Sequence, residues 1–210
     1  MAGIETRRRA SLPAKAGMGN ACDLGNGVRL HSIPMARLAV VTVLVLSLEW
    51  TRALVERSTG PIPTIAIGGL ALSLVAIGWR PEALGLSRTH LLPKLLGGLA
   101  IAAVLLLPAA VRWQGAPLLP PPLAISAIAI SVGEELAFRG ALFAALEAAF
   151  GPLAAVLGSS LIFAFGHVLS HPPLFLLAVL AAGLVLGTWR WAARDLVGPI
   201  VGHTLADLAL

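Results

Sequence analysis

The sequence is poor in charged residues and in cysteine, and each shortage excludes a class of protein. Asp, Glu, Lys and Arg make up only 12% of the 210 residues, about half of their share in an ordinary soluble domain, so a soluble globular protein is excluded. The chain is also 58% hydrophobic, which excludes an intrinsically disordered protein. The single cysteine, Cys22, excludes an intrachain disulfide framework.

Long apolar runs dominate the sequence instead. A membrane-spanning helix needs about 20 consecutive apolar residues, and several runs approach or exceed this length. Seven such segments cover roughly residues 35–55, 61–79, 93–113, 122–150, 152–170, 173–192 and 196–210. The expected fold is therefore all-α, a polytopic transmembrane helical bundle of about seven spans. Residues 80–94 are too polar to span and predict an interfacial turn or short helix.

Basic residues orient this bundle. With the N-terminus in the cytoplasm, eleven Lys and Arg residues, among them Arg190, fall on the inner side, and three, among them Arg52, fall on the outer side. This asymmetry predicts a cytoplasmic N-terminus. It also explains the net charge of +5 without nucleic acid, so no nucleic-acid partner is expected. The chain divides into a flexible basic tail, N-terminal transmembrane helices and a C-terminal transmembrane region, at residues 1–33, 34–119 and 120–210.

The first of three polar groups lies in the fourth apolar segment. A charged residue inside a span costs about 2.5–3.5 kcal/mol on insertion scales and marks a functional site by default. Glu134 and Glu135 are adjacent, and Arg139 follows Glu135 by four residues, which places that pair on one helical face. Glu135 and Arg139 can form an ion pair, which leaves Glu134 free to abstract a proton from water. The alternative is a purely structural salt bridge.

The other two groups contain histidine. Phe163 and His167 are four residues apart in the fifth segment, and His203 and Asp207 are four apart in the seventh, so each pair shares a helical face. Alone, His167 also fits a buried, hydrogen-bonded histidine, and the second pair fits a polar helix end. Together with a glutamate they can converge in a bundle interior, activate a water and stabilise an oxyanion. A site between the last four helices is therefore expected.

The three groups resemble the signature motifs of the CPBP family, the CAAX-protease and bacteriocin-processing (Abi) intramembrane proteases. They read, in order, Glu134-Glu135-x-x-x-Arg139, Phe163-x-x-x-His167 and His203-x-x-x-Asp207. The resemblance covers roughly residues 120–210, which would be the catalytic domain. It implies an intramembrane endopeptidase that uses a glutamate-activated water to hydrolyse a peptide bond near the C-terminal or membrane-proximal part of a substrate protein.

This resemblance implies a role for each residue of the site. Glu134 and His167 would activate the water, while His203 and the residue at position 207 would stabilise the oxyanion. Many relatives carry Asn at the last position, where Asp207 stands here; an ionised Asp cannot donate a hydrogen bond. Asp207 would therefore carry a proton, orient His203 as an acceptor, or bind a metal. No cofactor is expected, although zinc is possible, held by Glu134, His167 and His203.

The resemblance also implies supporting residues and partners. Glu135, Arg139 and Phe163 would support the site. The substrate would be a membrane-associated protein or peptide, and the enzyme would lie in the lipid bilayer of a bacterial cell inner membrane. The cytoplasmic N-terminus and the positions of the histidines in their segments, rather than the resemblance, predict a site in the outer half. Two other functions fit intramembrane glutamates and histidines: a non-catalytic immunity or scaffold protein of the same family, and a small proton-coupled transporter.

Overall fold

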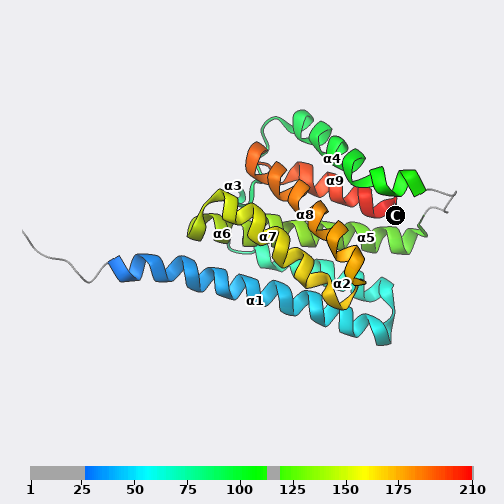
Figure 1. Ribbon diagram of the computed structural model, residues 1–210, viewed down its shortest axis with the longest axis horizontal. Coiled ribbons are helices and arrows are strands. Elements are labelled where there is room, and N and C mark those ends of the chain that lie inside the picture. Colours follow the sequence, from blue (N-terminus) through cyan, green and yellow to red (C-terminus); the bar gives the residue numbers. More distant parts are fainter. Residues whose placement is uncertain (1–26, 113–118, 210) are drawn as a thin grey trace, which may run out of the picture.

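The chain is built from helices in its computed structural model, which describes residues 27–112 and 119–209 (Figure 1). These two stretches contain no strand, so the predicted all-α bundle is confirmed. The helices are α1 (Gly27–Thr59), α2 (Pro61–Ser73), α3 (Pro81–Leu84), α4 (Leu91–Arg112), α5 (Pro121–Glu134), α6 (Phe143–Phe150), α7 (Pro152–Gly166), α8 (Pro173–Ala193) and α9 (Val197–Leu208). Two 3₁₀ segments, η1 (Leu74–Ala76) and η3 (His167–Leu169), and the π-helical segment η2 (Glu135–Leu142) complete them.

Five helical stretches are long and apolar enough to cross a membrane, judged by length and composition. They are Pro34–Thr59, Leu91–Pro108, Pro121–Phe150, Pro152–Leu169 and Pro173–Ala193. The other two predicted segments are helical but shorter. The second is the apolar helix Pro61–Ala76, and the seventh is α9, whose 12 residues extend about 18 Å against a hydrocarbon core of about 30 Å. The predicted short helix after the second segment is α3.

Proline and glycine mark where the helices begin and end. Helices α2, α3, α5, α7 and α8 each have proline in their first turn, where its fixed φ suits the helix and its missing N–H would have had no partner. Gly151 separates α6 from α7 and has a φ of 85°, a conformation that favours glycine. The chain turns there and carries α7 back along the bundle (Figure 1).

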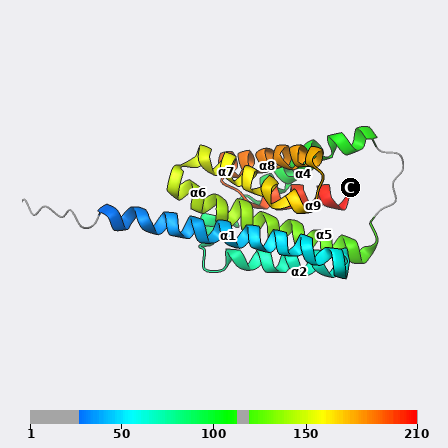
Figure 2. The same cartoon turned by 60° about the horizontal axis from the view of Figure 1, so that its bottom comes forward.

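Figures 1 and 2 place α5 between α1 and α2 on one side and α4, α8 and α9 on the other. Glycines let the backbones touch where α2 packs along α5 and α4 along α9. A β-carbon at Gly133 of α5 would overlap the carbonyl oxygen of Gly69, and one at Gly202 of α9 would overlap α4. Small residues commonly allow such close packing in membranes. Because Glu134 and His203 directly follow Gly133 and Gly202, these contacts fix the position of both side chains.

The bundle is apolar outside and charged inside. Large apolar side chains such as Val40, Leu161 and Leu174 are 58–84% exposed, whereas Glu135 and Arg139 are completely buried. A soluble protein shows the opposite tendency for its charged residues, while a protein in lipid keeps them in the bundle interior. With five helices of spanning length, the chain is an integral multi-pass membrane protein.

The predicted N-terminal tail is partly helical, and the placement of two basic residues needs correction. Helix α1 begins at Gly27, so the last residues of the predicted tail, 27–33, are helical; residues 1–26 of that tail lie outside the described residues. Arg190, counted as a flanking charge, is buried in the bundle, and the side chain of Arg52, counted likewise, is only 8% exposed. Without them, ten basic residues remain on the inner side and two on the outer side, so the predicted orientation is unchanged.

Candidate active site

Three separate helices bring an acid and two histidines together inside the bundle. The Glu134 carboxylate, at the end of α5, lies between two imidazole rings. Its Oε1 is 3.7 Å from Nε2 of His167, and its Oε2 is 3.8 Å from Nε2 of His203. His167 begins η3 at the end of α7, and His203 belongs to α9. All three residues are buried, so the predicted groups meet at one desolvated centre.

The helix that carries the first group changes its winding immediately after Glu134. Segment η2 is a π-helix. π-Helical turns are rare in proteins, but those that occur are often found at functional sites. Its first residue, Glu135, accepts a hydrogen bond of 2.9 Å from Nη1 of Arg139, and both side chains are completely buried. The ion pair predicted from the sequence is confirmed. Each charge neutralises the other in a region where an isolated charge would be costly.

Glu135 also fixes the ring of His203. Nδ1 of His203 lies 2.9 Å from Oε1 of Glu135, the oxygen that Arg139 also binds. A carboxylate paired with arginine only accepts, so Nδ1 carries the hydrogen and donates it. The opposite ring atom, Nε2, therefore faces Glu134 and lies 3.5 Å from Oδ2 of Asp207. Glu135 thus holds the His203 ring so that Nε2 faces the carboxylates of Glu134 and Asp207.

His167 is oriented by its own helix. Its Nδ1 lies 2.8 Å from the backbone carbonyl oxygen of Phe163, one turn earlier. Because a carbonyl oxygen accepts hydrogen bonds only, Nδ1 carries the hydrogen. In the neutral ring, Nε2 then has a free lone pair, and this is the atom that faces Glu134. His167, from the second of the three predicted groups, therefore supplies a hydrogen-bond acceptor, its Nε2 atom, to the centre.

The ring of Phe163 packs between the polar side chains. Its centroid is 4.6 Å from that of His167 and 6.0 Å from that of His203, in edge-on geometry. The guanidinium carbon of Arg139 lies 4.0 Å from the same centroid, in the range of a cation–π contact. The ring of Phe138 also packs against Phe163, with 5.1 Å between the two centroids. Phe163 therefore keeps the two histidines apart and covers the ion pair.

Asp207 lies at the edge of the centre, with its side chain 29% exposed. Its Oδ2 is 2.8 Å from the hydroxyl oxygen of Ser131 and 3.5 Å from Nε2 of His203. The Ser131 hydroxyl is also 2.7 Å from the carbonyl oxygen of Ala127 and can donate its one hydrogen to either. Of the three roles open to Asp207 from the sequence, this position suits an acceptor that orients His203.

One residue of the centre was not predicted from the sequence. Glu49 of α1 is completely buried and belongs with Glu134 and His167 to a group of possible ligand atoms within 4.8 Å of one another. Arg52 donates two hydrogen bonds, of 2.9 and 3.2 Å, to its Oε2. Helix α1 therefore lies beside the predicted site and adds a buried carboxylate to it. The available signal was an acid and a base three positions apart inside the first apolar segment.

The group that contains Glu49 differs from the set of residues expected to hold a metal ion. In the described part of the chain, the residues whose ligand atoms gather suitably are Glu49, Glu134 and His167. The expected zinc set contained His203 in place of Glu49. Nδ1 of His203 is bonded to Glu135, and His203 does not belong to the group that forms. Two carboxylates and an imidazole are nevertheless ligand types that zinc accepts.

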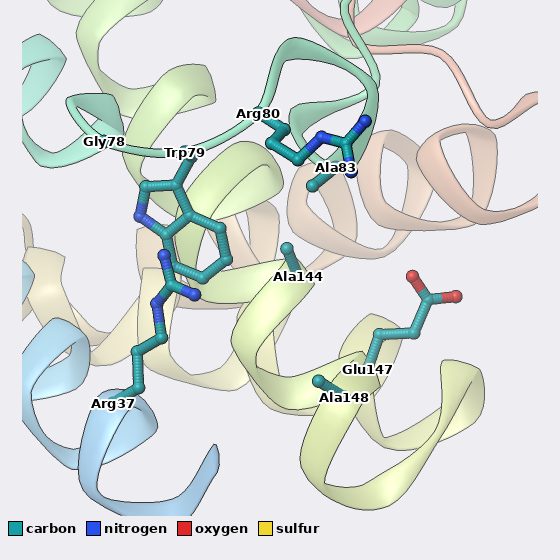
Figure 3. A pocket seen from close by; sticks show the side chains of 8 residues that line it. All are labelled: Arg37, Gly78, Trp79, Arg80, Ala83, Ala144, Glu147 and Ala148. Carbon is teal, nitrogen blue, oxygen red and sulfur yellow. The ribbon is translucent and has the colours of Figure 1, made fainter. Parts of the chain in front are cut away.

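A separate pocket of about 340 Å³ lies toward the N-terminal end of α1 (Figure 3). Arg37, Trp79, Arg80 and Glu147 line it, and the guanidinium carbon of Arg37 is 3.7 Å from the centroid of the Trp79 ring. Arg37 precedes Glu49 by twelve residues on the same helix, which corresponds to about 18 Å along its axis. The pocket is therefore distinct from the acid–histidine centre.

Comparison with known proteins agrees with the motif pattern. Residues 116–209 match the family described as type II CAAX prenyl endopeptidase Rce1-like. The match includes all three motifs and the stretch over which the resemblance was expected, so that resemblance is confirmed. No curated protein and no solved structure matches the chain.

Proposed function

Because residues 116–209 match the family described as type II CAAX prenyl endopeptidase Rce1-like, we propose that this protein is an intramembrane endopeptidase that attacks its substrate with a water activated by Glu134. One observation carries the proposal: the buried Glu134 carboxylate lies between the Nε2 atoms of His167 and His203, at 3.7 and 3.8 Å. A water held there would meet a base on one side and a possible hydrogen-bond donor on the other.

In the proposed reaction, Glu134 and His167 prepare the nucleophile. A water donates hydrogen bonds to the Glu134 carboxylate and to the free Nε2 lone pair of His167, which leaves an oxygen lone pair for attack on the peptide carbonyl carbon. As the new C–O bond forms, a water proton passes to Glu134. Glu134 then delivers that proton to the amide nitrogen as the C–N bond breaks. Glu134 thereby acts first as the general base and then as the general acid.

His203 is proposed to stabilise the oxyanion that forms at the carbonyl. Its Nδ1 hydrogen is already given to Glu135, so Nε2 must carry a second hydrogen to act as a donor. Glu135 and Asp207, on opposite sides of the ring, balance the positive charge of that form. A donor fixed in advance and aimed at the developing charge is an effective catalytic device. The role proposed for Asp207 is to orient His203, not to donate to the oxyanion.

The proposed substrate is a membrane-associated protein or peptide, cleaved near its C-terminal or membrane-proximal part. The centre lies toward the end of the bundle where α1 terminates: Arg57, near that end, donates a hydrogen bond of 3.1 Å to the carbonyl oxygen of Leu169, two residues after His167. With a cytoplasmic N-terminus, this end faces away from the cytoplasm. We propose that the site opens more easily to the extracytoplasmic side, and that the membrane is a bacterial cell inner membrane.

No resident metal is part of the proposed mechanism. The residues that would hold a zinc ion are Glu49, Glu134 and His167, which gather within 4.8 Å. Zinc bound there would act as a Lewis acid and make a bound water more acidic. The proposed mechanism obtains proton abstraction from Glu134 and oxyanion stabilisation from His203 without it.

Cleavage by purified protein tests this function. Peptides with an apolar, membrane-anchoring C-terminal segment are incubated with the detergent-solubilised protein, and the products are identified by mass spectrometry. Glu134→Gln preserves side-chain size but removes the base, so turnover should fall by about 100-fold or more. The matched control, Glu147→Gln, removes a carboxylate of the distant pocket and should change turnover by no more than about twofold.

The two competing functions give different results in the same preparation. A scaffold or immunity protein would cleave none of the peptides. A transporter would also cleave none, but in sealed vesicles it would move protons in a way that Glu134→Gln abolishes. Cleavage by the wild type that persists at full rate in Glu134→Gln would contradict the proposed mechanism.

A further inference from the structure

Helix α1 places a carboxyl group in the centre that none of the three motifs contains. Glu49 is completely buried. Its Oε2 accepts two hydrogen bonds from Arg52, at 2.9 Å from Nη2 and 3.2 Å from Nε. Its Oε1 has no hydrogen-bond partner among the described residues. A buried, unpaired acceptor costs free energy unless something satisfies it, so a native chain rarely keeps one without a reason.

Glu49, Glu134 and His167 form a set of acceptors that no side chain among them can satisfy. Ligand atoms of the three lie within 4.8 Å of one another. When both are ionised, the two carboxylates only accept, and the hydrogen of His167 is already donated from Nδ1 to a backbone carbonyl. An atom can be placed within about 2.8 Å of all three atoms at this spacing, which brings a water oxygen into hydrogen-bonding range of each. The geometry therefore suits a single water shared by the three residues.

The surrounding helices hold Glu49 in this position. Arg52, which binds Oε2, is itself paired with Glu56 at 3.3 Å on its other side. A β-carbon at Gly68 of α2 would overlap Cδ of Arg52, and one at Gly166 of α7 would lie 3.4 Å from Cγ of Glu49. Both glycines thus leave room for the pair. Glu49 is directed at the centre by an ion pair and by two backbones that pack closely around it.

We propose that Glu49 is a further catalytic residue, whose Oε1 binds the hydrolytic water together with Glu134 and His167. This inference rests on the proposed function. One water hydrogen is directed at Glu134 and leaves as the proton when the water attacks. The other stays on the oxygen and is held by Glu49 and His167 while the new C–O bond forms. Glu49 gains and loses no proton in this step; it holds the water in the direction of attack.

Glu49→Gln tests the proposal, with Glu56→Gln as its matched control. Both substitutions remove a carboxylate that pairs with Arg52, but only Glu49 reaches the water. We expect kcat of Glu49→Gln to fall by about 10- to 100-fold, the size of loss that misplacement of a reacting group causes, with KM nearly unchanged. Glu56→Gln should keep kcat within about threefold, because its interaction is a partly exposed ion pair.

A second variant covers the case in which Glu49→Gln does not fold. Glu49→Asp retains the charge that pairs with Arg52 but withdraws the carboxylate from the centre by one methylene. Its kcat should fall while its thermal unfolding stays close to that of the wild type. Full kcat in either folded Glu49 variant, or equal losses in Glu49→Gln and Glu56→Gln, would overturn the proposal.

Two further measurements separate this inference from its alternatives. Elemental analysis that finds one divalent metal per wild-type chain, lost in Glu49→Gln, would overturn it, because a cation would then occupy the place assigned to the water. Wild type and Glu134→Gln are assayed alongside. If the wild type cleaves nothing, the proposed function itself fails. If the wild type cleaves, Glu134→Gln does not, and Glu49→Gln retains full kcat, only the role of Glu49 is wrong.

Discussion

Replacing Arg139 with methionine should destabilise the bundle by several kcal/mol. Arg139 is completely buried, bonds Glu135 at 2.9 Å and lies 4.0 Å from the centroid of Phe163. Methionine fills part of the same volume but leaves Glu135, among the described residues, with His203 as its remaining hydrogen-bond partner. Loss of one member of a buried ion pair costs about 3–5 kcal/mol, and the lost cation–π contact adds about 0.5–2 kcal/mol. We expect the free energy of unfolding to fall by about 3.5–7 kcal/mol.

Unfolding in mixed detergent micelles, followed by far-ultraviolet circular dichroism, measures this loss. Glu135→Gln combined with Arg139→Met removes both charges and should recover a large part of it, because no uncompensated charge remains. Arg194→Met is the control: it breaks a more exposed ion pair with Glu147 and should cost less than about 1 kcal/mol. The reasoning is refuted if Arg139→Met costs no more than Arg194→Met.

Three further outcomes follow from the structure. Gly133→Ala should lower the melting temperature and the turnover together, because its methyl group would overlap the carbonyl oxygen of Gly69; an unchanged melting temperature contradicts that contact. In a Cys22→Ser background, a single cysteine at Ser170 should react with a membrane-impermeant thiol reagent on intact cells, and one at Arg194 should not; the reverse pattern would move the site to the cytoplasmic side. Purified active protein should contain far less than one zinc per chain and cleave equally well with a chelator present, whereas stoichiometric zinc would require a metal-based mechanism.

Local sequence patterns predicted the helices and the ion pair because their causes are local. Proline and glycine lie at the ends of apolar runs, and the same residues begin and separate the observed helices. Glu135 and Arg139 are four residues apart, which brings them together in almost any helical winding. The sequence does not reveal that this winding is a π-helix, because no residue type there demands it.

The features that the sequence missed depend on contacts between distant segments. Glu49 precedes Glu134 by 85 positions, and it reaches the centre only because α1 packs against α7 and η2. Arg52 was taken for a flanking charge because a count of basic residues ignores which side chains face the interior. Likewise, apolar composition located all seven segments, but it could not tell the 12-residue α9 from a full span.

The most direct test of the account is the fate of the water oxygen and its dependence on Glu134. Wild type and Glu134→Gln, shown to be equally folded, cleave the same peptide in water enriched in heavy oxygen, and mass spectrometry follows the new carboxyl terminus. The account predicts one heavy oxygen atom in that carboxyl group with the wild type, and product formation reduced by about 100-fold or more with the variant. Equal amounts of labelled product from both proteins would contradict it.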